Sequence, residues 1–121
     1  MKNSKLKTIL IFSIPLFFLH ALEEYFFKFY LLDPSFKWIG EIFNYTPANI
    51  FWVEQALGLL LLVITIYKPK KILLFIVGII FIVEVSHPMI AIFSHLYAGL
   101  ATSIPLILLG ILYWKNLFTR E

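Results

Sequence analysis

Two histidines and four glutamates lie inside or beside apolar stretches of this sequence, at spacings that could bring them together. The first group is the pentapeptide His-Ala-Leu-Glu-Glu, which contains His20, Glu23 and Glu24. On a helix these three side chains share one face, because residues three and four positions apart lie one turn from each other. Ionisable groups in an apolar setting are costly unless they are paired or bind an ion. The pentapeptide therefore predicts a polar site that is completed by other helices.

Three further ionisable residues are candidates for those partners. Glu84 and His87 are three positions apart, so a helix places them on one face. Glu54 is the acid of another apolar segment. Imidazole and carboxylate groups suit iron, manganese or zinc, and the chain has no cysteine that could supply sulfur. We expect a divalent metal ion (Fe, Mn or Zn) with ligands drawn from one set: His20, Glu23, Glu24, Glu54, Glu84 and His87.

The composition is typical of an integral membrane protein. Of 121 residues, 61% are hydrophobic and 14% are charged, whereas soluble domains carry roughly 25% charged residues. We predict an all-α fold, a membrane four-helix bundle in which residues 1–121 form a single transmembrane domain. The expected surroundings are membrane lipid, and no nucleic-acid partner is expected because the sequence has no motif for one. The predicted spans are residues 8–30, 49–67, 72–94 and 96–114.

Two features distinguish the later spans. The third contains Pro88, so we expect a kinked helix there. The fourth carries a face of small residues suited to close helix packing rather than to chemistry. That face consists of Gly99, Thr102, Ser103 and Gly110.

The basic residues predict how the chain crosses the membrane. Eight of the ten precede the first span, lie between the second and third spans, or follow the fourth, so four spans place them on one side of the membrane. Only Lys28 and Lys37 lie on the other side. Because basic residues favour the cytoplasmic side, both termini are expected in the cytoplasm.

The same orientation predicts one depth for the ionisable residues. His20 follows Lys7 by 13 residues, and Glu84 follows Lys71 by the same number. At about 1.5 Å per residue, both lie about 20 Å from the cytoplasmic edge. Glu54 lies near the outer start of the second span, which runs in the opposite direction. The site should therefore open towards the outer surface, where it would suit a lipid-like or other apolar substrate.

A metal-dependent enzyme, either a hydrolase or an oxygen-dependent oxidoreductase, is the function that this pattern favours. A metal ion would acidify a bound water or activate oxygen, and Glu23 or Glu24 could remain as the catalytic base. Three alternatives stay open. The cluster could be a structural set of buried pairs that specifies helix packing, it could belong to a proton or ion carrier, or His20 and His87 could clamp a haem.

The arrangement resembles the HXXEE-domain family of small, mostly bacterial membrane proteins. The resemblance rests on the His-Ala-Leu-Glu-Glu motif in the first span, followed by Glu54 in the second span and by Glu84 and His87 in the third. It covers about residues 9–114. It implies a bacterial cell membrane as the location and a membrane enzyme as the function. Only three site residues follow from the motif itself: His20, Glu23 and Glu24.

Overall fold

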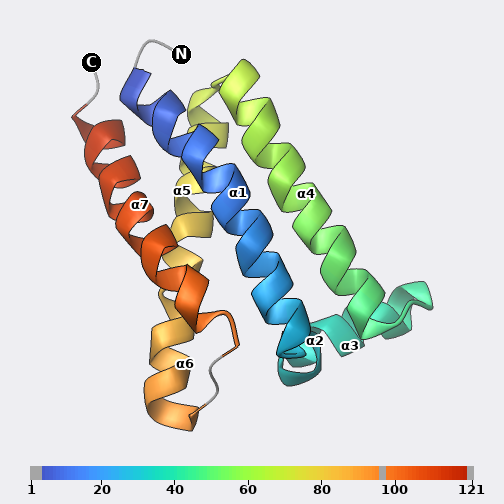
Figure 1. The fold of residues 1–121 in the computed structure, drawn as a ribbon. Helices are drawn as coiled ribbons and strands as arrows, with labels where there is room; N and C mark the ends of the chain where they lie inside the picture. Colours follow the sequence, from blue (N-terminus) through green and yellow to red (C-terminus); the bar gives the residue numbers. More distant parts are fainter. Residues whose placement is uncertain (1–3, 96–97, 120–121) are drawn as a thin grey trace.

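The chain folds into helices. The computed structural model describes residues 4–95 and 98–119, and within them it has seven helices and no strand. The predicted all-α class is confirmed. The helices are α1 (Ser4–Phe26), α2 (Phe29–Leu32), α3 (Pro34–Phe43), α4 (Pro47–Tyr67), α5 (Lys71–Val83), α6 (Ser86–Ser94) and α7 (Leu100–Phe118) (Figure 1).

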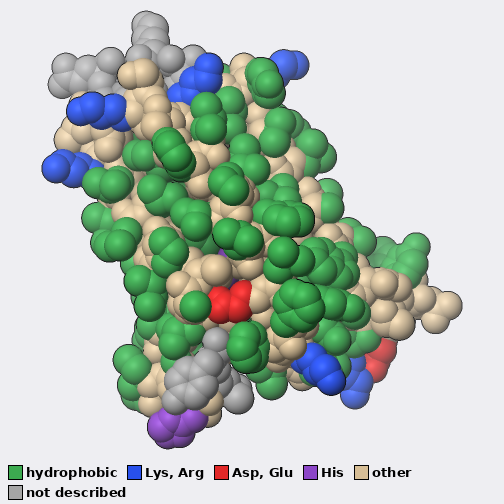
Figure 2. Space-filling model, viewed as in Figure 1, with side chains coloured by type: hydrophobic (Ala, Val, Ile, Leu, Met, Phe, Trp, Pro, Cys, Tyr) green, Lys and Arg blue, Asp and Glu red, His purple; other side chains and the backbone are tan. Residues whose placement is uncertain are grey.

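Four helical stretches are long and apolar enough to cross a membrane, as predicted: α1, α4, α5 together with α6, and α7. Their outward faces carry large hydrophobic side chains such as Phe12, Leu60, Ile79 and Leu108, each about half exposed or more. Figure 2 shows hydrophobic side chains over most of the visible face. Such a surface is matched to lipid, where helices satisfy their own backbone hydrogen bonds.

α1 lies at the centre of the bundle. It packs against α7 and α4, while α5 packs against α7. The buried core between them includes Leu10, Leu74 and Leu106. The start of α1, the end of α7 and the turn between α4 and α5 lie at one end of the molecule, and α2, α3 and α6 lie at the other (Figure 1). Hydrogen bonds near the first end hold α5 to α7: the Tyr113 hydroxyl donates to the Leu74 carbonyl (2.6 Å) and the Trp114 indole to the Gly78 carbonyl (3.0 Å).

The third span bends one turn before its proline. Pro88 has no amide hydrogen, so the Glu84 carbonyl loses the partner that a regular helix would provide four residues later. The helix is interrupted between α5 and α6, and the His87 amide donates to the Glu84 carbonyl instead (3.3 Å). The expected kink is therefore present, and Glu84 lies at the bend.

Capping residues set where the other spans begin. α4 starts at Pro47 because the Thr46 side chain accepts a hydrogen bond from the Asn49 amide (3.3 Å), as an N-cap does. α7 starts at Leu100, later than the expected residue 96, because Gly99 has a φ of 78° that a helix interior does not contain. Residues 96 and 97 lie outside the described ranges. Asp33 caps α3, so the segment between the first two spans is itself largely helical.

Candidate metal centre

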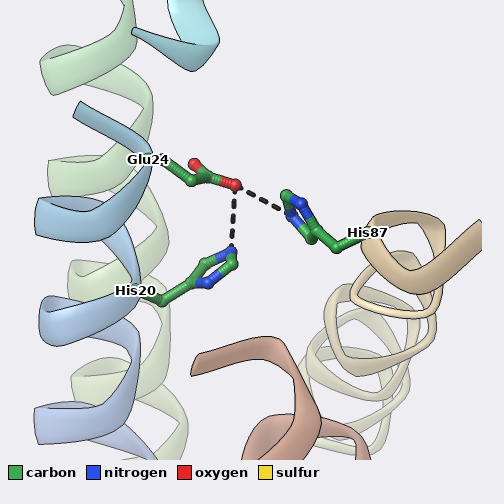
Figure 3. Close-up of side chains that lie close together, drawn as sticks. All are labelled: His20, Glu24 and His87. Atoms are coloured by element: carbon green, nitrogen blue, oxygen red, sulfur yellow. Dashed lines mark ion pairs between the residues drawn. The ribbon is translucent and has the colours of Figure 1, made fainter. Parts of the chain in front are cut away.

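Four buried ionisable side chains from α1 and the α5–α6 bend meet at one place. The Glu24 Oε1 atom lies 2.9 Å from Nε2 of His20 and 2.9 Å from Nε2 of His87 (Figure 3). The Glu84 Oε2 atom lies 2.9 Å from Nε2 of His20 and 3.8 Å from Nε2 of His87. None of the four residues is more than 6% exposed. Of the six residues predicted to converge, these four lie together.

Local helix geometry explains the convergence. His20 and Glu24 are four residues apart on α1, so their side chains lie one above the other. The bend before Pro88 turns the end of α5 so that Glu84 and His87 face the same point from the other side of the bundle. Each helical segment thus contributes one imidazole and one carboxylate.

The outer nitrogen of His87 determines which atom the ring presents to the centre. His87 Nδ1 lies 2.8 Å from the carbonyl oxygen of Ala98. Because a carbonyl can only accept a hydrogen bond, Nδ1 carries the hydrogen and donates it. When the ring is neutral, Nε2 therefore carries no hydrogen, and its lone pair points towards Glu24. Histidine binds a metal ion in this neutral form.

A longer chain of hydrogen bonds fixes the same tautomer in His20. The Thr102 hydroxyl donates its single hydrogen to Glu23 Oε1 (2.8 Å). It must therefore accept from His20 Nδ1, which lies 2.7 Å away. The neutral ring again presents its Nε2 lone pair to the centre. Both histidines are thus held in the orientation and tautomer that outer partners impose on metal ligands.

Glu23 belongs to this outer layer and lies outside the ligand group. Its carboxylate accepts hydrogen bonds from the Ala101 amide (3.2 Å) and the Thr102 amide (2.9 Å) at the start of α7. These amides have no partner within the helix, and Gly99 at the N-cap has no side chain to offer them. A carboxylate is also favoured by the positive end of the helix dipole. The structure therefore brings Glu23 to α7, although the sequence placed it among the ligands and bases.

Gly99 closes one side of the centre with bare backbone. A Cβ atom at this position would lie 2.8 Å from His20 Cε1, 2.9 Å from His87 Cε1 and 3.0 Å from Glu24 Cγ. Sequence reasoning assigned Gly99 and Thr102 to helix packing and so missed their role here. In the sequence, the one feature that marks these two residues is the face of small residues on the fourth span. Such a face is expected both where two helices pack closely and where backbone covers a polar site, so it does not distinguish the two.

The ligand group has the spacing of a metal site. One ligand atom from each of His20, Glu24 and His87 lies within 4.8 Å of the other two, so the group could hold a metal ion. Tetrahedral zinc with bonds of about 2.1 Å separates its ligands by about 3.4 Å. The 2.9 Å distances from Glu24 to the two histidines are shorter, as in hydrogen-bonded ion pairs, so these side chains would move apart by about half an ångström to hold an ion. The Glu84 Oε2 atom is also buried, and it lies 2.9 Å from His20 Nε2 and 3.8 Å from His87 Nε2. It could serve as a fourth ligand.

Glu54 lies on the wall of a cleft that also contains the candidate ligands. The cleft has a volume of about 670 Å³ and is lined by α1, α4 and the α5–α6 region, including His20, Glu24, Glu84 and His87. The Glu54 side chain is exposed and is not part of that group. His95 is also exposed; it caps the end of α6 with a φ of 54°.

Comparisons with known proteins add no assignment. Neither the protein families, nor the curated proteins, nor the solved structures contain a match to this chain. The resemblance to the HXXEE-domain family stays a prediction.

Proposed function

We propose that this protein is a membrane enzyme that binds one divalent metal ion through His20, Glu24 and His87. The observation that carries the proposal is the pair of oriented histidines, whose Nε2 atoms both lie 2.9 Å from one carboxylate oxygen at the wall of a mostly apolar cleft. Two histidines and one carboxylate form the ligand set of both zinc hydrolases and non-haem iron oxygenases. Zinc, iron and manganese are therefore the candidate metals, and the cleft suits a lipid-like or other apolar substrate.

Chemistry at this centre would divide between the ion and two layers of side chains. A bound divalent ion supplies a Lewis acid and an acidified water or an oxygen-activating centre. Glu84 is the base closest to the ligand atoms, because its Oε2 atom lies 2.9 Å from His20 Nε2 and 3.8 Å from His87 Nε2. This role replaces the one that the sequence suggested for Glu23 or Glu24. The Glu23–Thr102–His20 chain holds the His20 ring in place.

Elemental analysis of the detergent-purified protein is the direct test. The wild-type protein should carry about one metal ion per chain, and His20→Ala and His87→Ala should each carry less than about a tenth of that, since each removes a ligand. His95→Asn is the matched control, because it replaces an exposed histidine outside the centre and asparagine tolerates the positive φ.

The structural alternative gives a different result in the same experiment. Glu24 contacts both histidines, which is also what a buried ion-pair network that specifies packing would show. In that case the wild-type protein would carry no metal, and His20→Ala and His87→Ala would be destabilised without any change in metal content. Circular dichroism of each variant separates loss of metal from loss of fold.

Thr102→Val tests the outer layer. The change keeps the shape of the side chain but removes the hydroxyl that accepts from His20 and donates to Glu23. Metal affinity should fall by about 10–100-fold, as it does when such outer partners are removed. Competition with a chelator of known affinity measures the change, and Thr102→Ser, which retains the hydroxyl, should stay near wild type. Equal affinities in the valine and serine variants would contradict an orienting role.

We also propose that both termini face the cytoplasm and that the cleft opens in the outer half of the membrane. In support, the described basic residues at the α1 start, the α4–α5 turn and the α7 end lie at one end of the bundle, away from Lys28 and Lys37 (Figures 1 and 2). The chain has no cysteine, so single cysteines report sidedness. A membrane-impermeant maleimide should label Lys37→Cys in intact cells and Lys70→Cys only after permeabilisation. The reverse pattern would invert the topology.

A further inference from the structure

The cleft beside the metal centre carries acidic groups at one end and is apolar at the other. Glu54 on α4 and Asp33 before α3 line the acidic end, near the junction with α2 and α3, together with Phe29 and Phe36. Leu62 on α4 and Phe17 on α1 line the other. Leu62 is two helical turns from Glu54, so the two ends are about 12 Å apart along α4. The volume of about 670 Å³ lies within the range of about 300–1,000 Å³ that small-molecule sites occupy.

Every charged group on the cleft wall is acidic or can be a metal ligand. Among the described residues that line it, there is no lysine or arginine. Glu54 has no hydrogen bond or ion pair within residues 4–95 and 98–119, and the charges of Glu24 and Asp33 act on it unfavourably. Glu84 lines the same cleft, where its Oε2 atom contacts His20 and His87.

We propose that the cleft binds a single-chain cationic amphiphile, such as a long-chain amine or quaternary ammonium compound. Its cationic head lies beside Glu54, and its tail extends along α4 towards Leu62 and Phe17. The inference deepens the proposed enzyme function by naming a substrate class, and it rests on that function only for the reaction. The binding preference itself depends on Glu54 and on the shape of the cleft.

Charge balance favours a cation over an anion. A divalent ion at the centre would be neutralised by Glu24 and Glu84, which leaves Glu54 and Asp33 with no cation in the described structure. An unpaired carboxylate at membrane depth is costly, and a cationic head would remove that cost. A phosphate or carboxylate head would instead add like charge to an acidic wall, which disfavours binding.

The position of the head group beside Glu54 also determines which part of the ligand lies near the metal ligands. The metal ligands lie on the cleft wall at the level of His20 and Glu84, between the acidic end and the apolar end. With the head beside Glu54, the bonds nearest to the centre are those close to the head group. The terminal part of the tail lies farthest from it.

Binding of three ligands with the same twelve-carbon tail tests the proposal. The protein is placed in zwitterionic-lipid nanodiscs and titrated with radiolabelled dodecyltrimethylammonium, dodecanol or dodecanoate. The cation should bind at least about tenfold more tightly than the anion. Glu54→Gln should remove most of this preference. Glu41→Gln is the matched control and should retain it, because Glu41 is an exposed acid on α3 that does not line the cleft.

Gly58 provides a second variant that blocks the cleft itself. It lines the cleft, and a Cβ atom added there would meet no atom within 4 Å. Leucine also has a higher helix propensity than glycine. Gly58→Leu should therefore fold and keep its metal ion, yet weaken binding of all three ligands by about tenfold or more, since its side chain occupies the space of the tail.

The outcomes separate this proposal from the enzyme proposal. If the protein carries no metal but still prefers the cation, and Glu54→Gln abolishes the preference, the cleft assignment stands and the metal centre fails. If dodecanoate binds as tightly as the cation, or if Glu54→Gln leaves the preference unchanged, the cleft assignment is overturned even when the metal is present. Unchanged binding to Gly58→Leu would likewise overturn it.

Discussion

Adding a chelator is expected to lower the free energy of unfolding of the wild-type protein by about 3 kcal/mol and to leave that of Glu24→Gln unchanged. The ligands come from α1 and α6, which are far apart in sequence, so the complete site exists only in the folded chain. A ligand that binds only the folded state stabilises it by mass action, by about 2.7 kcal/mol when its concentration is 100 times its dissociation constant. Glu24→Gln removes the carboxylate that lies between the two histidines.

The measurement is unfolding in mixed micelles with and without chelator, at a fixed metal concentration. Glu41→Gln, which changes an exposed acid on α3 outside the centre, is the matched control. It should keep both the stability and the chelator effect. A wild-type protein that is indifferent to the chelator would favour the structural ion-pair reading. A chelator effect that survives in Glu24→Gln would exclude Glu24 as a ligand.

Gly99→Ala should abolish metal binding and destabilise the fold by about 2–4 kcal/mol. Two effects combine at this position. The backbone has a φ of 78°, which an L side chain rarely adopts, and the new Cβ would lie 3.0 Å or less from atoms of His20, His87 and Glu24. The rings are held by hydrogen bonds to Ala98 and Thr102, so they cannot move aside without losing them.

Metal content and unfolding measured on the same preparation report both effects. Gly58→Ala is the control, because the same added carbon meets nothing within 4 Å there, and it should keep both the metal and the stability. If Gly99→Ala retains full metal content, the backbone at this position does not close the centre, and the arrangement described around α7 would need to be revised.

Membership in the candidate centre was only partly predictable from the sequence. The spacing of His20 and Glu24 determines that they meet, because residues four apart on a helix lie on one face. The rise of a helix determines that Glu84 reaches the same depth. Neither rule predicts whether Glu23 or its neighbour Glu24 contacts the histidines. The outcome depends on where α7 begins, because Glu23 binds the first amides of that helix. Glu54 has the right depth, but the direction in which it faces depends on how α4 packs.

Composition and helix geometry are properties of each segment alone, so they were enough to predict four apolar spans that carry ionisable residues. Three features could be seen only once the helices were packed: which carboxylate faces the histidines, that Thr102 and Ala98 orient their rings, and that Gly99 covers them. They depend on packing because the rotation of each helix about its axis is set by contacts with its neighbours. In a membrane bundle those contacts come from small residues and a few polar ones, which leave little trace in the pattern of a single segment.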